Sequence, residues 1–169
     1  LGLSLPTVNQ NLKMLMEDGL IEYVGNFTST GGRRAQAITI NNNARKAISV
    51  NIKADYINVD VVGLKGQIIY SMAVKAHFSK SRAYIEKLTD AVRHAVDYVG
   101  ADADDILGVG VTVPGILDDE KQILISAPPL KAKNYDFTRL ISAIDYPVVV
   151  MNDARAEAYA DHWFNGKPE

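Results

Sequence analysis

Three strand-like segments that follow one another with short connections place the strongest constraint on the fold of this chain. They are KAISVNI (46–52), YINVDVVGL (56–64) and QIIYSMAVKA (67–76). All three are rich in β-branched residues, and Lys65-Gly66 suits a hairpin turn between the second and the third. A long helix is expected next, capped by Ser81 and ending at Gly100, because apolar residues recur between these positions at helical spacing.

The rest of the chain alternates predicted strands with predicted helices. The strands are ILGVGVTV (106–113), QILIS (122–126) and PVVVM (147–151), and the helices cover 136–144 and 153–164. Apart from the short strand 122–126, the order is βββαβαβα, which is typical of an α/β fold. Trp163 and Phe164 end the last helix and are expected to pack in the core.

Composition excludes several classes of protein. With 47% hydrophobic and 22% charged residues, the 169-residue chain has the composition of an ordinary globular protein with one or two domains. It contains no cysteine, which excludes disulfides and thiolate metal sites. The apolar runs are strand-sized and the N-terminus does not resemble a signal peptide, so we expect a cytoplasmic protein without membrane contact. His77, His94 and His162 are far apart, and no metal site is predicted in this segment.

Charge divides the chain into two parts. Residues 1–46 carry five basic and three acidic side chains, whereas the rest carries 13 basic and 17 acidic ones. We therefore predict two domains, residues 1–43 (the head) and residues 44–169 (the body), with the polar sequence Asn41-Asn42-Asn43 at their junction. The excess of basic residues over 1–46 suggests a polyanionic partner for this part of the chain.

The head has the sequence pattern of a helix followed by a β-hairpin. Ser4 is suited to cap a helix with Pro6 in its first turn, and Gly19 ends it. Two predicted strands, 20–24 and 35–40, are joined by the loop GNFTSTGGRR. This order matches the second half of a winged helix-turn-helix, whose helix enters the DNA major groove while the hairpin tip contacts the backbone or the minor groove.

Each feature of the head also has a simpler interpretation. The helix could be an ordinary solvated helix, and Arg33-Arg34 could be a solubilising turn. Taken together, a polar helix face and two arginines beside two glycines favour DNA binding, because the glycines let the arginines approach phosphates closely. The predicted DNA-binding residues are Ser4, Pro6, Thr7, Asn9, Gln10, Lys13, Arg33 and Arg34.

Two longer stretches resemble the ROK family of repressors, open reading frames and kinases. LSLPTVNQNLKMLMEDGLIEYVGNFTSTGGRRAQAITIN is similar to its DNA-binding segment, and GVGVTVPGILDDEKQILISAPPL with VVVMNDARAEA is similar to the first lobe of its sugar-binding domain. The resemblance implies an RNase H-like fold of the actin and sugar kinase superfamily. It also implies a second lobe with a zinc site, absent here, so we expect a fragment that lacks part of both domains and itself holds no cofactor.

The resemblance separates kinases from repressors at the first hairpin. ROK kinases carry an Asp-x-Gly-Gly-Thr turn, where glycines let backbone N–H groups reach ATP phosphates and the aspartate helps to hold Mg²⁺. The matching residues here are Asn51, Ile52, Lys53, Ala54 and Asp55. Without the glycines and the magnesium carboxylate, ATP binding of the kinase type is not expected, and the body is predicted to be a sensor rather than an enzyme.

Three residues of the body are predicted to bind sugar: Gly115, Asn152 and Asp153. The resemblance assigns Asp153 to the position of the kinase base and Gly115 to a close approach of the backbone to the sugar. Asp153 could instead cap a helix, and Gly115 could simply form a turn after a proline. Pro129 departs from the family, which usually has a sugar-contacting asparagine there.

Three functions are therefore weighed. The leading one is a sugar-responsive transcriptional repressor that binds operator DNA, as a homodimer because two-fold symmetry suits palindromic half-sites. The second is a sugar kinase with a degenerate phosphate loop. The third is a regulator that answers to a protein partner instead of a sugar, which Pro129 leaves open.

Overall fold

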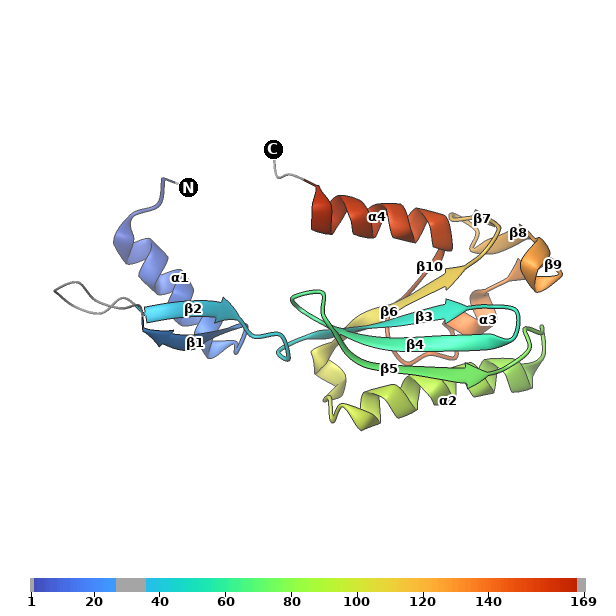
Figure 1. Cartoon of the computed structure of the whole chain (residues 1–169), viewed down its shortest axis with the longest axis horizontal. Coiled ribbons are helices and arrows are strands. Elements are labelled where there is room, and N and C mark those ends of the chain that lie inside the picture. The colour runs from blue at the N-terminus through green and yellow to red at the C-terminus, as the bar shows by residue number, and fades with distance from the viewer. Residues whose placement is uncertain (1, 27–35, 167–169) are drawn as a thin grey trace.

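A mixed five-stranded sheet forms the centre of the body, and its strand order is β10-β6-β3-β4-β5 (Figure 1). The computed structural model describes residues 2–26 and 36–166. Strands β3, β4 and β5 are antiparallel, whereas β6 and β10 run parallel to β3. The five strands are β3 (Lys46–Ile52), β4 (Tyr56–Gly63), β5 (Ile68–Lys75), β6 (Ile106–Val113) and β10 (Val148–Asn152).

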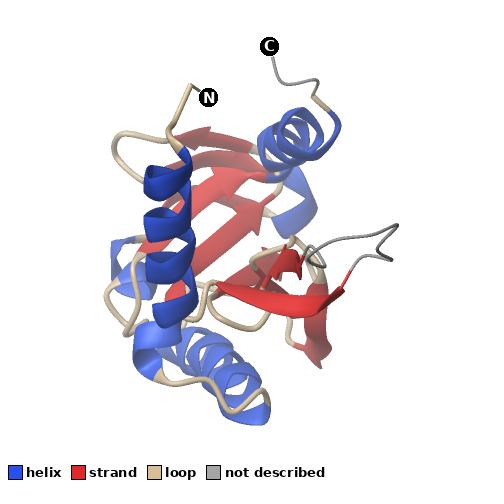
Figure 2. Ribbon diagram, turned by 90° about the vertical axis from the view of Figure 1, so that its left-hand side faces the viewer, coloured by secondary structure: helices blue, strands red, loops and turns tan. Residues whose placement is uncertain are grey.

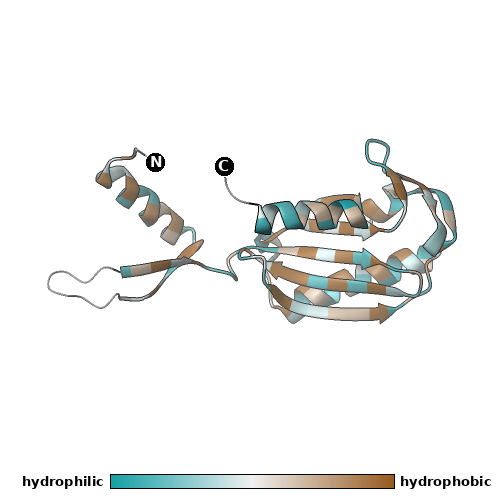
Figure 3. Ribbon diagram, turned by 45° about the horizontal axis from the view of Figure 1, so that its top comes forward, coloured by the Kyte–Doolittle hydropathy of each residue, from teal (hydrophilic) through white to brown (hydrophobic). Residues whose placement is uncertain are grey.

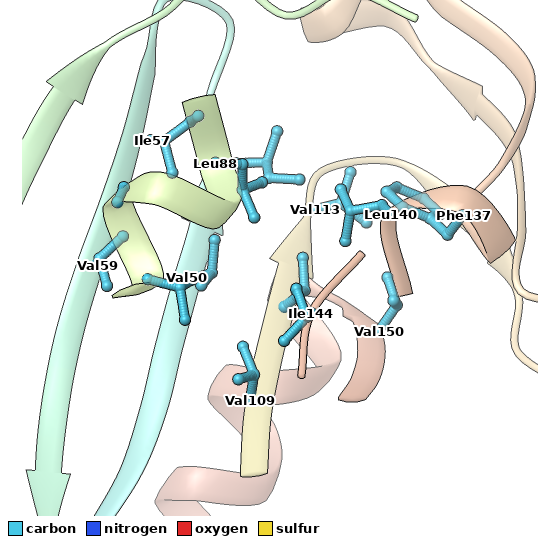
Figure 4. Packing of buried hydrophobic residues seen from close by; sticks show 14 of the residues in the cluster. Val50, Ile57, Val59, Leu88, Val109, Val113, Phe137, Leu140, Ile144 and Val150 are labelled. Carbon is cyan, nitrogen blue, oxygen red and sulfur yellow. The ribbon is translucent and has the colours of Figure 1, made fainter. Parts of the chain in front are cut away.

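The hydrophobic core lies between this sheet and helix α2 (Arg82–Tyr98). Alternate residues of β3 are buried, among them Val50, because successive strand residues point to opposite faces. Leu88 of α2 belongs to the same buried cluster as Val50 and Ile57 (Figure 4). Ser81 caps the helix as expected, since its Oγ accepts a hydrogen bond of 3.2 Å from the Tyr84 N–H. Apolar residues gather on the strands of the sheet (Figure 3).

A second, three-stranded sheet is inserted between β6 and β10. It consists of β7 (Ile116–Asp118), β8 (Ile123–Ala127) and β9 (Ala132–Asp136), and the 3-10 turn η2 (Pro128–Leu130) connects β8 to β9. Only β8 was expected. The predicted helix over 136–144 is wrong in length, because the structure has only α3 (Thr138–Ile141). Asp136 accepts hydrogen bonds from the N–H and hydroxyl of Thr138, so the helix begins after it, while buried Tyr135 pairs with Leu124 in the sheet.

Helix α4 (Asp153–Asn165) crosses the other face of the main sheet (Figure 1). The expectation that Trp163 packs in the core is wrong, because this residue is 81% exposed. It lies in the last turn of the helix and lines an open hollow beside Leu64 and Leu107. No helix among the described residues is long and apolar enough to cross a bilayer.

The head contains a helix and a hairpin, as the sequence predicts. Helix α1 (Leu5–Glu17) precedes β1 (Ile21–Asn26) and β2 (Gln36–Ile40), which pair antiparallel. Figure 2, viewed from this end, shows α1 and the hairpin in front of the main sheet. The predicted tip residues Arg33 and Arg34 lie outside the described residues.

Candidate functional site

Three strand ends meet at one edge of the main sheet. Strand β3 ends just before Lys53, β6 leads to Gly115, and β10 leads to Asn152 and Asp153. Because β3, β6 and β10 are parallel and adjacent, their carboxyl ends lie side by side. In open α/β sheets this edge is where ligands bind. The structure thus brings together the three predicted sugar-binding residues and adds Lys53.

Asn152 holds this edge together. Its Oδ1 accepts a hydrogen bond of 3.0 Å from the Arg155 N–H and so caps α4. Its Nδ2 donates to the Gly115 carbonyl at 2.5 Å and to Asp153 Oδ1 at 3.3 Å. Both N–H donors of the amide and one of the two acceptor positions of its oxygen are therefore used within the protein. A direct contact of Asn152 with sugar stays a prediction, and its observed role is to position its neighbours.

Gly115 occupies a place that only glycine fits. Its φ is +111°, and a Cβ built there would lie 2.3 Å from the carbonyl oxygen of Ser126 and 2.8 Å from Ala127 Cα. The close neighbour is the backbone of β8, so the glycine lets the second sheet approach the end of β6. Its contact with sugar also stays a prediction.

Asp153 presents one free carboxylate oxygen toward Lys53. Because Asn152 is the cap of α4, Asp153 is the first residue of the helix, where its Oδ1 accepts a hydrogen bond of 3.0 Å from the Ala154 N–H. Its Oδ2 lies 3.9 Å from Lys53 Nζ. The ammonium group donates and the carboxylate accepts, so together they can hold a hydroxyl group from both sides. Both side chains are partly exposed and accessible to a ligand.

The β3–β4 turn does not resemble a phosphate-binding turn. It consists of Lys53, Ala54 and Asp55, and the carboxylate of Asp55 pairs with His77 Nδ1 at 2.8 Å. An acidic group at this position repels phosphate. Deeper in the site, Asn51 Oδ1 is buried and has no hydrogen-bond partner among the described residues.

Six of the eight predicted DNA-binding residues lie on one exposed helix or at its cap, and the other two, Arg33 and Arg34, lie outside the described residues. Ser4 Oγ caps α1 by accepting a hydrogen bond from the Thr7 N–H at 3.4 Å, and Pro6 lies in the first turn. Lys13 forms an exposed ion pair of 3.5 Å with Glu17. The exposed positions of the helix also include Asn9 and Gln10. Asn9 and Lys13 line a hollow of about 340 Å³ between α1 and β1.

Comparison with known proteins identifies the family of the chain. The ROK family profile matches residues 47–169. The chain belongs to the ROK family. A putative xylose repressor from Caldicellulosiruptor sp. strain Rt8B.4 is 29% identical over 95% of this chain and 41% of its own length. The chain spans about two fifths of the length of the curated relatives it matches.

Solved ROK structures share the fold. The crystal structure of a ROK family transcriptional regulator, a homologue of E. coli MLC protein, has a TM-score of 0.65 and 21% identity, covering 96% of this chain and 41% of that one. A ROK family glucokinase from Streptomyces griseus, in complex with glucose and AMPPNP, has a TM-score of 0.55 and 27% identity, covering 70% of this chain and 36% of that one. The fold is therefore that of the ROK proteins, of the actin and sugar kinase type.

One feature of the site was missed by reasoning from sequence. The sequence places Lys53 only in the turn that matches the kinase phosphate turn, yet its ammonium group faces Asp153. The two residues come together because β3 and β10 both flank β6 and end at the same edge, a strand order that no local sequence pattern contains. The pairing of Asp55 with His77 was missed as well, since the two residues are 22 positions apart.

Proposed function

We propose that this chain is a sugar-responsive, DNA-binding transcriptional repressor. The observation that carries the proposal is the placement of Lys53 opposite Asp153, in a site whose phosphate turn lacks glycine and contains Asp55. Such a site binds hydroxyl groups but does not favour ATP.

The extent of the matches supports a repressor over a kinase. The ROK family profile begins at residue 47, yet the alignment with the putative xylose repressor covers 95% of this chain and therefore includes the head. The glucokinase structure covers only 70% of the chain. The head is thus shared with a regulator, and regulators of this kind need a part that binds DNA. We therefore assign DNA binding to the head.

In this proposal the head is part of a winged helix-turn-helix. Helix α1 enters the major groove, where Asn9 and Gln10 meet base edges, and the β1–β2 hairpin carries Arg33 and Arg34 to phosphates. The start of the helix is set by Ser4, Pro6 and Thr7. Contacts of the helix with the DNA backbone are made by these residues and by Lys13. A homodimer, which presents two such heads to a palindromic operator in the cytoplasm, is part of the proposal.

The body is the sensor in this proposal. A carbohydrate lies at the strand ends, where Asp153 accepts hydrogen bonds from its hydroxyl groups and Lys53 donates to their oxygens. Gly115 and Asn152 shape the edge of the site. Pro129, in η2, lacks a side-chain donor or acceptor, which leaves a protein effector as the alternative.

A thermal-shift screen over neutral sugars, amino sugars and sugar phosphates tests the proposal in the complete protein. We expect at least one carbohydrate to raise the melting temperature, and no sugar-dependent hydrolysis of ATP. Asp153→Ala should abolish the shift, because a carboxylate paired with hydroxyl groups contributes charge-assisted hydrogen bonds of about 1.5–3 kcal/mol each. Glu157→Ala, an exposed acid one turn further along α4, is the matched control and should keep the shift.

Two outcomes would overturn the proposal. Phosphorylated sugar that accumulates with the purified protein, and is lost in Asp153→Ala, would establish a kinase. If Asp153→Ala keeps the sugar-induced rise in melting temperature, the carbohydrate binds somewhere other than this site.

A further inference from the structure

The junction between head and body is fastened by hydrogen bonds on both sides. It consists of residues 41–46, which directly follow β2 and include the first residue of β3. Its sequence, with three consecutive asparagines, has the composition of a free linker. The contacts of these asparagines differ from that expectation.

Asn41 attaches the junction to the head. Its N–H donates to the Leu20 carbonyl at 2.9 Å, and its Nδ2 donates to the Gly19 carbonyl at 3.0 Å. Its Oδ1 accepts from the Asn43 N–H at 3.0 Å, which turns the chain toward the body. Since Gly19 and Leu20 connect α1 to β1, the junction follows the position of α1.

Asn42 attaches the junction to the body at the β4–β5 turn. Its carbonyl accepts from the Leu64 N–H at 3.2 Å, and its Oδ1 accepts from the Lys65 N–H at 2.9 Å. Gly63 makes this contact possible, because a Cβ there would lie 2.3 Å from the Asn42 carbonyl oxygen and 2.6 Å from its Oδ1. The φ of Gly63 is not in the left-handed region, so the contact alone requires glycine at this position.

Two cationic side chains strengthen the attachment. Arg45 Nη1 donates to the Ala44 carbonyl and to Asp105 Oδ1, both at 2.9 Å, and Asp105 directly precedes β6. Lys46 is buried, and its ammonium group donates to the Asn43 carbonyl at 2.8 Å. A buried ammonium group holds its acceptor in place, because losing that hydrogen bond leaves a charge without a partner.

We propose that Asn42 is the positioning residue that couples the head to the sensor body. This inference rests on the proposed function. Strands β3 and β6 both begin beside the junction and both end at the ligand site, at Lys53 and Gly115. A ligand that shifts these strand ends shifts the start of β3 and the turn that Asn42 contacts. Because Asn41 and Asn42 join the head rigidly to these elements, the head moves with them.

The coupling is tested first without any ligand or DNA. Amide ¹⁵N relaxation of the chain, whose mass of 18.5 kDa suits this method, reports how the head and the body tumble. The native chain should show one correlation time for both. Asn42→Ala removes the side-chain hydrogen bond to the Lys65 N–H, and the added Cβ of Gly63→Ala collides with the Asn42 carbonyl oxygen. Each variant should give the head a shorter correlation time than the body. Asn43→Ala is the control, because Asn43 uses only its backbone in these contacts.

The second measurement is the affinity of the complete protein for DNA, with and without D-xylose or another sugar from the screen. Allosteric couplings are typically about 5–150-fold. We expect Asn42→Ala to bind sugar as the native protein does. The ratio of its DNA affinities without and with sugar should fall toward one. Asn43→Ala should keep the native response.

The outcomes separate this inference from the proposed function. Independent tumbling of the head in the native chain, or a full sugar response in both Asn42→Ala and Gly63→Ala, overturns the coupling role of Asn42. A native protein that binds neither sugar nor DNA contradicts the proposed function, while the relaxation result still decides whether the junction is rigid.

Discussion

Replacing Gly115 with alanine should destabilise the body and separate the two sheets where the ligand site is built. The added methyl group would lie 2.3 Å from the Ser126 carbonyl oxygen and 2.8 Å from Ala127 Cα, both of which are backbone atoms of β8. Backbone does not move aside as a flexible side chain does, so β7 and β8 must shift away from β6. The shift would break the hydrogen bond from Asn152 to the Gly115 carbonyl.

Two contributions determine the size of the effect. A non-glycine residue at φ +111° costs about 1–3 kcal/mol in backbone strain. Overpacking of a close contact costs a further 1–3 kcal/mol, roughly. The free energy of unfolding should therefore fall by about 2–6 kcal/mol. For a chain of this length each kcal/mol corresponds to about 2–4 °C in melting temperature.

Chemical denaturation monitored by circular dichroism measures this loss, with Gly110→Ala as the matched control. Gly110 lies in the same strand, β6, and a Cβ there meets only the Ile48 carbonyl oxygen at 4.0 Å, an ordinary contact. Its substitution should leave stability unchanged or raise it by up to about 1 kcal/mol. Equal stability of the two variants would refute the requirement for glycine at position 115.

Further predictions concern the aromatic core, pH and DNA. The hydroxyl groups of Tyr84 and Tyr135 are buried without partners among the described residues. In denaturant unfolding, either Tyr→Phe variant should therefore have the same free energy of unfolding as the native chain, or one that is higher by up to about 1 kcal/mol. Burial, with Tyr135 nearby, raises the pKa of Tyr84 above its ordinary value of 10.0. The neutral Tyr84 side chain therefore contributes to stability below pH 10, and this contribution is lost as the pH rises. Tyr84→Phe should reduce the loss of stability at alkaline pH in a pH series of unfolding curves. The hydroxyl and N–H of Thr138 hold the pKa of Asp136 below its ordinary 3.8, so its contribution is lost as the pH falls through that lowered pKa; Thr138→Val should raise this pKa in an NMR titration, and an unchanged value would contradict the assignment. Replacing Arg33 and Arg34 with alanine should weaken binding to operator and to random DNA alike, and should reduce the salt dependence of the affinity by about two phosphate contacts. An unchanged slope of log affinity against log salt concentration would mean that the pair is only a solubilising turn.

The main sheet was predictable because its strands carry a strong local signal. β3 and β4 alternate buried residues with partly or fully exposed ones, and the turns between the first three strands are too short for anything but hairpins. The second sheet was not predictable in the same way. β7 has three residues, and β9 reads AKNYD, in which Asn134 adopts a φ of +48° that no periodicity reveals. Pairing with β8, to which the η2 turn connects it, decides its conformation, and the sequence of β9 alone does not show this pairing.

The candidate site was predictable in its residues but not in its contacts. A strand that ends in Asn152 and a helix that starts at Asp153 can be recognised from the sequence. Which of the two caps the helix depends on backbone geometry, and the structure assigns the cap to Asn152. The approach of Lys53 to Asp153 depends on the order of β3, β6 and β10 in the sheet, which no local pattern contains.

The most direct test of the sugar-responsive repressor is the affinity of the complete protein for its operator as a function of sugar concentration. The operator is first selected by the protein from a random duplex library, and affinity is measured by fluorescence anisotropy at fixed salt. The account predicts that a sugar which stabilises the protein weakens its binding to the operator, and that Asp153→Ala binds the operator equally well with and without this sugar. Operator affinity that stays constant while the native protein is saturated with sugar would contradict it.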